Sequence, residues 1–328
     1  MAAATGYMAS ISLYIAAKLG IADLLANGPV PVGSLAGQTS VHPERLYRVL
    51  RALASLGIFT ETAPGTFGLT PAADLLRSDV PGSSRAMAIW ICDPFHLKLF
   101  SELPHSVKTG ETTIEHVFGK AAFEYFASDP VEADAFNAAM TSFSRTTVPA
   151  ILDAYDFSSI GTLVDVGGGH GYLLCSVLEK YPAMRGTVVE LESVAPGAQA
   201  SIAARGLSDR CSAVAGDIFA HIPPGGDAYI MKHILHDWND EKAAIILKNC
   251  HKALEGKPDG KILVVDAIIT PGNEPHPGKF IDLEMMVFCG SKERTEQEFR
   301  ELFASAGFRL TRVIPTRSPS CLLEAVPQ

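Results

Sequence analysis

Charge is scarce in this chain. Only 19% of its 328 residues are charged, against about 25% in ordinary globular chains, while hydrophobic residues make up 47%. This composition excludes a disordered chain or a fibrous repeat and indicates a large buried core. Because the length exceeds what one core usually organises, we expect two domains, or one domain with a large helical extension.

Positive charge is the scarcer sign. Lys and Arg together number 27 and Asp and Glu number 36, which gives a net charge of −9. A negative overall field does not attract phosphate backbones, so nucleic acid is not an expected partner.

Long apolar runs and paired cysteines are also missing. The absence of any stretch of about 18 apolar residues excludes a membrane-spanning helix. The uncharged first seventeen residues lack the basic start of a signal peptide, and Ser10 and Ser12 interrupt them. The six cysteines form no CxxC pair, so we interpret them as reduced thiols and expect no metal site. These absences predict a soluble, cytoplasmic protein without a membrane partner.

Residues 1–95 carry the pattern of a helical module. A helix is predicted from about Thr5 to Leu25, and the lack of charge on its outer face indicates a subunit interface. A short helix at Ser34–Gln38, a helix at Glu44–Leu56 that stops at Gly57, and a β-hairpin around Ala63-Pro64-Gly65 follow. This is the order of a winged helix, a fold that often binds DNA.

Charge decides between the two uses of a winged helix. Residues 1–85 hold six basic and five acidic side chains, and a net charge of +1 is weak for phosphate binding. We therefore favour a dimerisation module and keep a DNA-binding regulator as the alternative.

Residues 96–150 are interpreted as a helical connector with prolines between its helices. In the helix that follows Pro130, the side chains of Phe136, Met140 and Phe143 share one side. Such a stripe is typical either of core packing or of a substrate pocket, and the pattern alone leaves both open.

From residue 151 onward strands and helices alternate, which predicts a doubly wound, mostly parallel, Rossmann-like α/β sheet. In such a sheet ligands bind beyond the carboxyl ends of the strands. Helices at Asp240–Leu254 and Glu296–Ala306 are expected to begin at the N-caps Asn239 and Thr295, the second with Glu298 in a capping box. The predicted strands are 162–166, 186–189, 212–215, 228–231, 261–266, 310–314 and 321–325.

The first of these strands runs into Gly167-Gly168-Gly169-His170-Gly171, whose glycines let the backbone approach a ligand. Glu190 ends the second strand, 23 residues after Gly167, where a carboxylate can accept both hydrogen bonds of a ribose diol. After the third strand, Asp217 can accept from an adenine amino group, with Ile218 against the ring. The pattern predicts a nucleoside-binding site.

Two cofactors compete for this site. NAD normally uses a GxGxxG loop and places its pyrophosphate on the helix N-terminus, whereas this loop is GxGxG. Asp165 lies two residues before the first glycine and would repel a pyrophosphate. It suits the cationic sulfonium and amino groups of S-adenosylmethionine. We therefore expect that cofactor, with S-adenosylhomocysteine as product and no metal.

The fourth strand leads into a pair of histidines, His233 and His236, either of which could be merely structural. Two acids favour a catalytic role: Asp266 ends the neighbouring strand, where it could meet His236, and Glu293 precedes a capped helix. A histidine with a pKa of about 6.5 can take the proton of a phenol as its oxygen attacks a methyl group. A carboxylate on the other ring nitrogen fixes the tautomer.

With these residues the chain resembles the S-adenosylmethionine-dependent O-methyltransferases of the caffeate and acetylserotonin type, particularly their bacterial branch. The resemblance covers nearly the whole length. It implies a dimerisation domain at 1–95, a connector at 96–150 that contributes to the substrate pocket, and a catalytic domain at 151–328. Its most specific parts are Asp165-Val166-Gly167-Gly168-Gly169, His236-Asp237-Trp238 and Lys292-Glu293-Arg294-Thr295.

The resemblance also implies roles for single residues. The general base falls on His236, and its flanking acids fall on Asp266 and Glu293. Glu190 and Asp266 depart from the plant pattern, which has aspartate and glutamate there, so the reach of Asp266 to the base is shorter. The implied cofactor contacts are Gly167, Glu190, Asp217, Ile218 and Lys232. The implied acceptor pocket holds Met140, Phe143 and Met285, with Trp90 as a further candidate.

The implied function is methyl transfer to a hydroxyl, most simply a phenolic one, of a small flat secondary metabolite, by a homodimer. Two alternatives share the fold: methylation of nitrogen or carbon, and use of the cofactor for hydroxylation or decarboxylation. The presence of His236 and both acids argues against the second alternative, because relatives of that kind tend to lose the base.

Overall fold

The computed structural model describes residues 2–328, with side chains from residue 4 onward. The chain divides into two compact units. The first comprises residues up to Ser101 together with Phe126–Thr146, and the second comprises Glu102–Tyr125 together with Thr147–Gln328. Residues 96–150 are thus shared between the units.

The first unit begins with two helices where the sequence predicted one. Helix α1 spans Ala2–Lys18 and α2 spans Ile21–Leu24. Between them Gly20 has a φ of 67°, the left-handed conformation that commonly follows a helix end. The prediction of a continuous helix to Leu25 was therefore wrong beyond Lys18.

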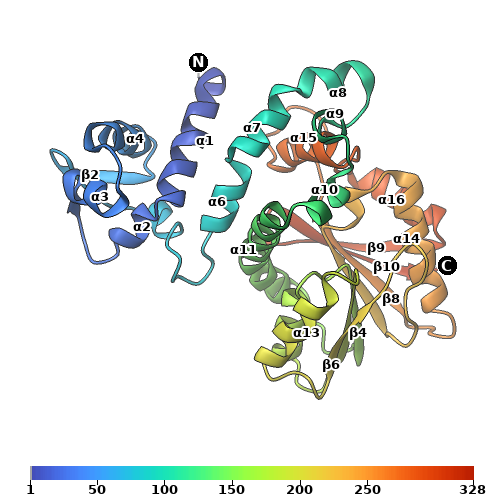
Figure 1. Cartoon of the computed structure of the whole chain (residues 1–328). Coiled ribbons are helices and arrows are strands. Elements are labelled where there is room, and N and C mark those ends of the chain that lie inside the picture. The colour runs from blue at the N-terminus through green and yellow to red at the C-terminus, as the bar shows by residue number, and fades with distance from the viewer. Residues whose placement is uncertain (1) are drawn as a thin grey trace. The chain divides into compact units, whose positions relative to one another are not determined.

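The remainder of this unit has the predicted winged-helix order. Helices α3 (Val32–Thr39) and α4 (Pro43–Ser55) precede the hairpin of β2 (Phe59–Ala63) and β3 (Thr66–Leu69) (Figure 1). The short strand β1 (Val30–Pro31) pairs with β3, so the sheet order is β1-β3-β2. Apolar side chains on the inner faces of these elements form one core. Helices α5 (Pro71–Asp74), α6 (Arg85–Ile91) and α7 (Pro94–Ser101) follow.

The second unit is built on a seven-stranded sheet with the order β6-β5-β4-β7-β8-β10-β9. Strand β10 is antiparallel to both of its neighbours, and the other paired strands are parallel. The predicted fold class is confirmed, and each predicted strand end lies within two residues of the observed one. The strands are β4 (Thr162–Val166), β5 (Arg185–Glu190), β6 (Cys211–Ala215), β7 (Ala228–Lys232), β8 (Lys261–Ala267), β9 (Phe308–Pro315) and β10 (Ser320–Pro327).

The strand order changes direction between β4 and β7. From β4 the chain adds β5 and β6 on one side and then returns to place β7 on the other. A ligand crevice opens at such a reversal, beyond the carboxyl ends of the strands.

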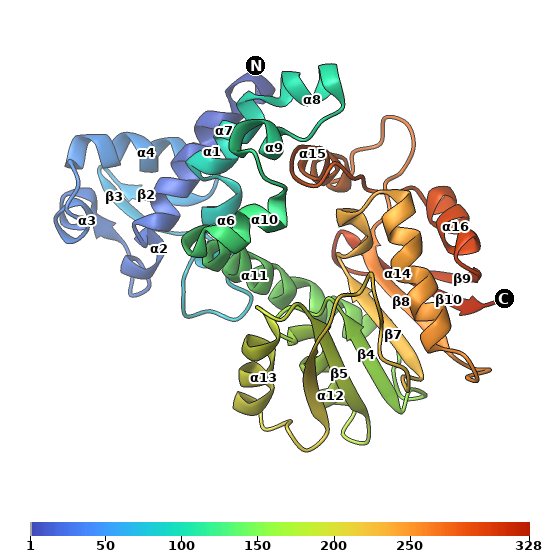
Figure 2. The ribbon, with the colours of Figure 1, turned by 45° about the vertical axis from the view of Figure 1, so that its right-hand side comes forward.

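Helices cover both faces of the sheet. Helices α12 (Tyr172–Lys180) and α13 (Ala195–Ala204) contribute to one buried apolar cluster, and α14 (Asp240–Ala253) and α16 (Glu296–Ser305) contribute to the other. Figure 2 shows α13 and α14 beside the strands that they cover. The predicted N-caps are confirmed: Asn239 accepts a hydrogen bond at the start of α14, and Thr295 forms a capping box with Glu298.

Five helices fill residues 94–154, as the sequence indicated: α7, α8 (Leu103–Thr109), α9 (Thr113–Phe118), α10 (Ala122–Ser128) and α11 (Pro130–Ala154). Within the second unit, α8 and α9 pack against α15 (Gly278–Phe288). Between residues 2 and 328 no helix is long and apolar enough to cross a membrane.

Candidate active site

The predicted cofactor and base residues of the second unit gather at one edge of the sheet. Gly167 follows β4, Glu190 ends β5, Lys232 ends β7 and Asp266 lies near the end of β8. These four strands are neighbours and parallel. Their carboxyl ends therefore meet beside the reversal of strand order, where this fold binds ligands.

The glycine loop after β4 is closely packed. Gly167 has a φ of 69°, and a Cβ atom there would lie 2.5 Å from Ile234 Cδ1. At Gly168 a Cβ atom would lie 2.6 Å from Asp165 Oδ2. A side chain at either position would collide with Ile234 or Asp165, so the close packing of the loop requires glycine at both positions.

Glu190 is fixed beside this loop. Its Oε1 accepts from the backbone N–H of Gly169 at 3.1 Å, and its Oε2 accepts from that of Leu191 at 2.6 Å. Burial raises the pKa of Glu190, although these two hydrogen bonds oppose the rise. Each carboxyl oxygen keeps a second lone pair, so the group can still accept from a ribose diol.

Asp165, which is buried on β4, and Lys232, which is half-buried at the end of β7, interact electrostatically. Asp165 is 1% exposed, and its Oδ2 has no hydrogen-bond partner among the described residues. Burial raises its pKa to about 7, and the nearby Lys232 opposes the rise. Burial also lowers the pKa of Lys232. An acid with one oxygen still open to a donor fits a cationic ligand group at this position, as the sequence indicated, and not a pyrophosphate.

The loop after β6 carries Asp217 and Ile218. Asp217 Oδ1 accepts from the N–H of Phe219 at 2.9 Å. From α14, Asn249 Nδ2 donates to the carbonyl oxygens of Ile218 and Phe219, both at 2.9 Å. The loop is therefore held in shape, while the Asp217 side chain stays exposed to solvent.

His236 lies on the short helix η1 (Leu235–Asp237) and is buried. Its Nδ1 is 2.7 Å from Glu293 Oε1. Ser291 Oγ donates to the backbone oxygen of His236, and the N–H of Glu293 donates to Asp282 Oδ1 at 2.8 Å. Hydrogen bonds to the backbone of His236 and of Glu293 thus fix both side chains. The arrangement is that of a base and the acid that orients it.

Arg294 fixes the segment that carries His236. Although its side chain is fully buried, it donates to the carbonyl oxygens of Leu235 and Trp238, each at 2.8 Å, and pairs with Asp240. The charge of the guanidinium is therefore satisfied by the backbone on both sides of His236.

Asp266 lies near His236 but makes no hydrogen bond to it. Its closest ionic partner is Nδ1 of His233 at 3.5 Å, and neither of its carboxyl oxygens has a hydrogen-bond partner among the described residues. Because aspartate is one carbon shorter than glutamate, its contribution to His236 is electrostatic. Burial raises the pKa of Asp266 to about 7, against the lowering effect of His236.

Two further residues join this group without having been assigned a role from the sequence. Asp237 Oδ1 is 3.5 Å from Nε2 of His236. His233 has a φ of 55° and lies with its Nε2 at 3.1 Å from Ser320 Oγ. Both residues belong to the same short motif as His236. The sequence, however, contains no pattern that would predict the left-handed φ of His233.

Carboxylates decide the charge of His236. Burial lowers its pKa, but Asp237, Glu293 and Asp266 together raise the pKa to about 10. Burial raises the pKa of Asp237 to about 6. His233 responds in the opposite way: burial and the positive charge of Lys232 lower its pKa well below the ordinary value. One imidazole of the pair is therefore strongly basic and the other stays neutral.

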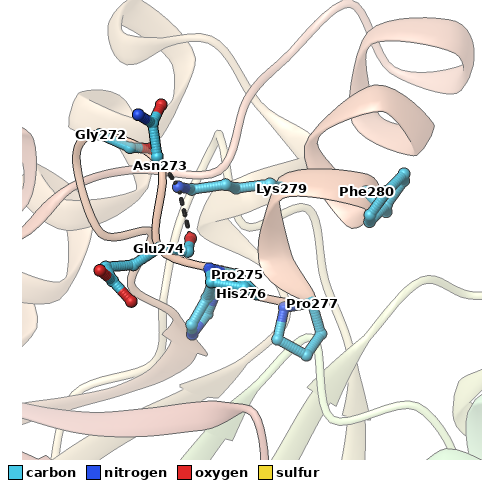
Figure 3. A pocket seen from close by; sticks show the side chains of 8 residues that line it. All are labelled: Gly272, Asn273, Glu274, Pro275, His276, Pro277, Lys279 and Phe280. Atoms are coloured by element: carbon cyan, nitrogen blue, oxygen red, sulfur yellow. Dashed lines mark hydrogen bonds between the residues drawn. The ribbon is translucent and has the colours of Figure 1, made fainter.

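The predicted pocket residues lie on different units. Met140 and Phe143 are half-buried on α11 in the first unit, and Met285 is buried on α15 in the second. A hollow of about 460 Å³ lies on the loop between β8 and α15, lined by residues 272–277, 279 and 280 (Figure 3). Lys279 Nζ donates to two carbonyl oxygens of that loop. None of the predicted site residues lines this hollow.

Family models recognise both halves of the chain. The O-methyltransferase dimerisation domain matches residues 1–79, and the O-methyltransferase domain matches residues 100–309. The chain belongs to the O-methyltransferase family. This membership confirms the predicted family, the class of enzyme and S-adenosylmethionine as its methyl donor.

Several known members of this O-methyltransferase family are similar over nearly the whole chain. The phenazine O-methyltransferase PhzM of Lysobacter antibioticus is 44% identical, covering 98% of this chain and 94% of its own. The solved structure of LaPhzM matches with a TM-score of 0.92, and the match covers 100% of this chain and 98% of that structure's chain. The solved structure of NcsB1, an O-methyltransferase from neocarzinostatin biosynthesis, contains S-adenosylmethionine and a naphthoic acid. It is 32% identical and has a TM-score of 0.80, and the match covers 97% of this chain and 96% of that one.

One similar enzyme methylates nitrogen. The 8-amino-8-demethylriboflavin N,N-dimethyltransferase of Streptomyces davaonensis is 33% identical over 95% of this chain and 90% of its own. Similar chains therefore include enzymes that act on more than one kind of acceptor atom.

Proposed function

We propose that this enzyme transfers a methyl group to a phenolic hydroxyl of a small flat metabolite, with His236 as the general base. The observation that carries the proposal is the buried contact of 2.7 Å between His236 Nδ1 and Glu293 Oε1. The carboxylate holds the Nδ1 proton, so in the neutral imidazole the lone pair of Nε2 can accept the proton of the acceptor.

The reaction balances within this arrangement. Bound S-adenosylmethionine supplies an electrophilic methyl group and a positive charge that opposes protonation of His236. Nε2 of His236 would take the proton as the acceptor oxygen forms its bond to the methyl carbon, while the bond from sulfur to that carbon would break and leave S-adenosylhomocysteine. The imidazolium is then stabilised by Glu293, with Asp237 and Asp266 close by.

Other residues of the strand ends would bind the methyl donor. Glu190 would accept from the ribose diol, Asp217 from the adenine amino group, and Asp165 would face the amino group of the methionine part. The backbone of the loop at Gly167 would contact the same part, and Ile218 would pack on the adenine ring. Lys232 lies beneath this site as the counter-charge of Asp165.

The positioning of the acceptor oxygen against the methyl group should contribute more to the rate than proton transfer does. General-base help accelerates a reaction by about 10²–10⁴-fold, or roughly 3–5 kcal/mol. Alignment of two reacting groups can contribute about 7–11 kcal/mol. The rigid support of η1 by Arg294 is consistent with this balance, because it fixes the backbone that carries His236.

His236→Ala tests the base directly. We expect turnover to fall by about 10²–10⁴-fold on a weakly acidic phenol, with a smaller loss on an acidic phenol that ionises without help. The affinity for S-adenosylhomocysteine, measured by calorimetry, should stay unchanged. Full activity of the variant on the weakly acidic phenol would exclude His236 as the base.

Nitrogen methylation is the second candidate, and the similarity to a known N,N-dimethyltransferase supports it. The same imidazole could take a proton from an amine. The chemical shift of the transferred methyl carbon separates the two outcomes, because an O-methyl carbon resonates far from an N-methyl carbon.

The acceptor pocket would be formed by Met140, Phe143 and Met285, with Trp90 as a further candidate. Methionine is polarisable and adapts to flat aromatic rings. The similar enzymes that act on a phenazine or bind a naphthoic acid support a flat acceptor. Substitution of Met140 or Met285 by Ala should change the KM for acceptors more than the affinity for the cofactor.

The working enzyme would be a cytoplasmic homodimer, without nucleic-acid or membrane partners. The dimerisation domain matched at residues 1–79 supports the dimer. The net charge of −9 argues against nucleic acid. All six cysteines carry free thiols, and four of them are buried, which is consistent with a reducing compartment.

A further inference from the structure

Three aromatic rings are stacked next to the loop that carries Asp217 and Ile218. Trp238 meets Phe219 edge-on, with ring centroids 4.7 Å apart. On Trp238 the ring of Phe123 is stacked at 5.7 Å and 26°. Phe123 comes from α10, within the stretch Glu102–Tyr125 that belongs to the second unit. A helix far away in the sequence thus contacts the wall of the predicted adenine site.

Two of the three rings are held firmly. The backbone oxygen of Trp238 accepts from Arg294, and Lys242 Nζ lies 5.1 Å from the centre of the Trp238 ring. Phe219 is fixed through its own N–H to Asp217 and through its carbonyl oxygen to Asn249. These two rings therefore keep a constant relation to the loop beside them.

Phe123 is the exposed member of the stack. Its side chain is 37% exposed, and the Asp217 side chain across the stack is exposed as well. Phe123 therefore forms the solvent-facing end of the stack, on the far side of Trp238 from Phe219. Removal of the Phe123 ring would leave Trp238 uncovered on that side.

We propose that Phe123 is a positioning residue that retains the cofactor: through Trp238 it closes the adenine end of the site, and α10 must move away before the nucleoside leaves. The inference rests on the proposed function, because it takes Asp217 and Ile218 as the adenine contacts. An aromatic pair of this kind changes an equilibrium by about 2- to 12-fold. The release rate of S-adenosylhomocysteine should change by a similar factor.

Trp238 itself can report the event. The chain has two tryptophans, Trp90 and Trp238, so a Trp90→Phe background leaves a single emitter inside the stack. In this background we would mix the complex of the enzyme and S-adenosylhomocysteine with excess S-adenosylmethionine. The emission of Trp238 would be followed by stopped flow. The same measurement would be made for Phe123→Ala, Phe123→Leu and Phe123→Tyr.

We expect Phe123→Ala and Phe123→Leu to release S-adenosylhomocysteine about 2- to 12-fold faster. Phe123→Tyr, which keeps the ring, should restore the rate. Phe280→Ala is the matched control, because Phe280 on α15 (Figure 3) is 78% exposed and is not one of the three stacked rings. Unfolding temperatures equal to that of this control would show that the variants are folded. If Phe123→Ala does not fold, Phe123→Leu serves as the test.

Release rates equal to that of the parent in both Phe123→Ala and Phe123→Leu would overturn the inference. Asp217→Ala separates this failure from failure of the proposed cofactor site. If Asp217→Ala loses affinity while the Phe123 variants behave as the parent, only the retention role is wrong. If Asp217→Ala keeps full affinity, the placement of adenine is wrong and the proposed cofactor site fails with it.

Discussion

At the scale of single residues, buried carboxyl groups without hydrogen-bond partners show where ligand charge is expected. Asp165 and Asp266 are both almost completely buried, and each has an oxygen with no partner among the described residues. Burial of an unpaired acid costs stability unless a cation or a donor arrives. Asp165 lies on β4 and Asp266 on β8, with β7 between them. We propose that Asp165 serves the cofactor, whereas Asp266 lies beside the two imidazoles.

The pH dependence of cofactor binding tests the role of Asp165. Because its pKa is raised to about 7, the carboxyl group is neutral below that pH and negative above it. The affinity for S-adenosylhomocysteine, whose amino group is positive, should rise between about pH 5.5 and about pH 7.5, by at most tenfold per unit.

Calorimetry at several pH values would measure this slope. Asp165→Asn has no group that titrates at this position and should bind with a flatter pH profile. An identical slope in the parent and in Asp165→Asn would assign the pH dependence to another group.

At the scale of elements, the N-terminus of α16 connects fold and site. The capping box of Thr295 and Glu298 was predicted from the sequence and is present. It begins α16 directly after Glu293 and Arg294, the two residues that support His236. Short-range hydrogen bonds of this kind depend on a few neighbouring residues, and for that reason the local sequence predicts them well.

Loss of this cap should be measurable as lost stability. Thr295→Ala removes an acceptor for the backbone N–H of Glu298 and should cost about 1 kcal/mol. In a unit of this size the unfolding temperature should fall by about 2–4 °C. Thr295→Ser, which keeps the hydroxyl, should unfold near the parent temperature, and an equal loss in both variants would point to the methyl group instead of the cap.

At the scale of the whole molecule, the first helix is where a second copy is expected. On α1, Tyr7 and Met8 are each 53% exposed, side by side in the sequence. Large apolar side chains in this position fit the subunit interface that the uncharged helix indicated and that the dimerisation domain supports.

A charge at this place should weaken the dimer. Met8→Glu would bury an unpaired carboxylate in the interface, so light scattering should show a larger share of monomer at low protein concentration. Val107→Glu, at a residue that is 71% exposed on α8, is the control and should leave the mass unchanged. If Met8→Glu has the same mass as the parent, α1 does not form the interface.

Local sequence patterns were enough to predict the helices, the strands and the kind of chemistry. Runs of β-branched and aliphatic residues, the glycines after β4 and the N-caps act within a few residues, so strand positions and helix starts could be predicted closely. The acids at strand ends also followed from the sequence, because parallel strands bring their carboxyl ends to one edge.

Tertiary structure alone decided which side chains touch. Glu293, and not Asp266, holds the base at hydrogen-bond distance, because the chain length of the acid and the backbone position of η1 fix its reach. The insertion of β10 between β8 and β9 and the stacking of Phe123 on Trp238 join residues distant in the sequence. Periodicity reports whether a side chain is buried, but the partner that buries it is chosen by packing between elements, and no local pattern contains that choice.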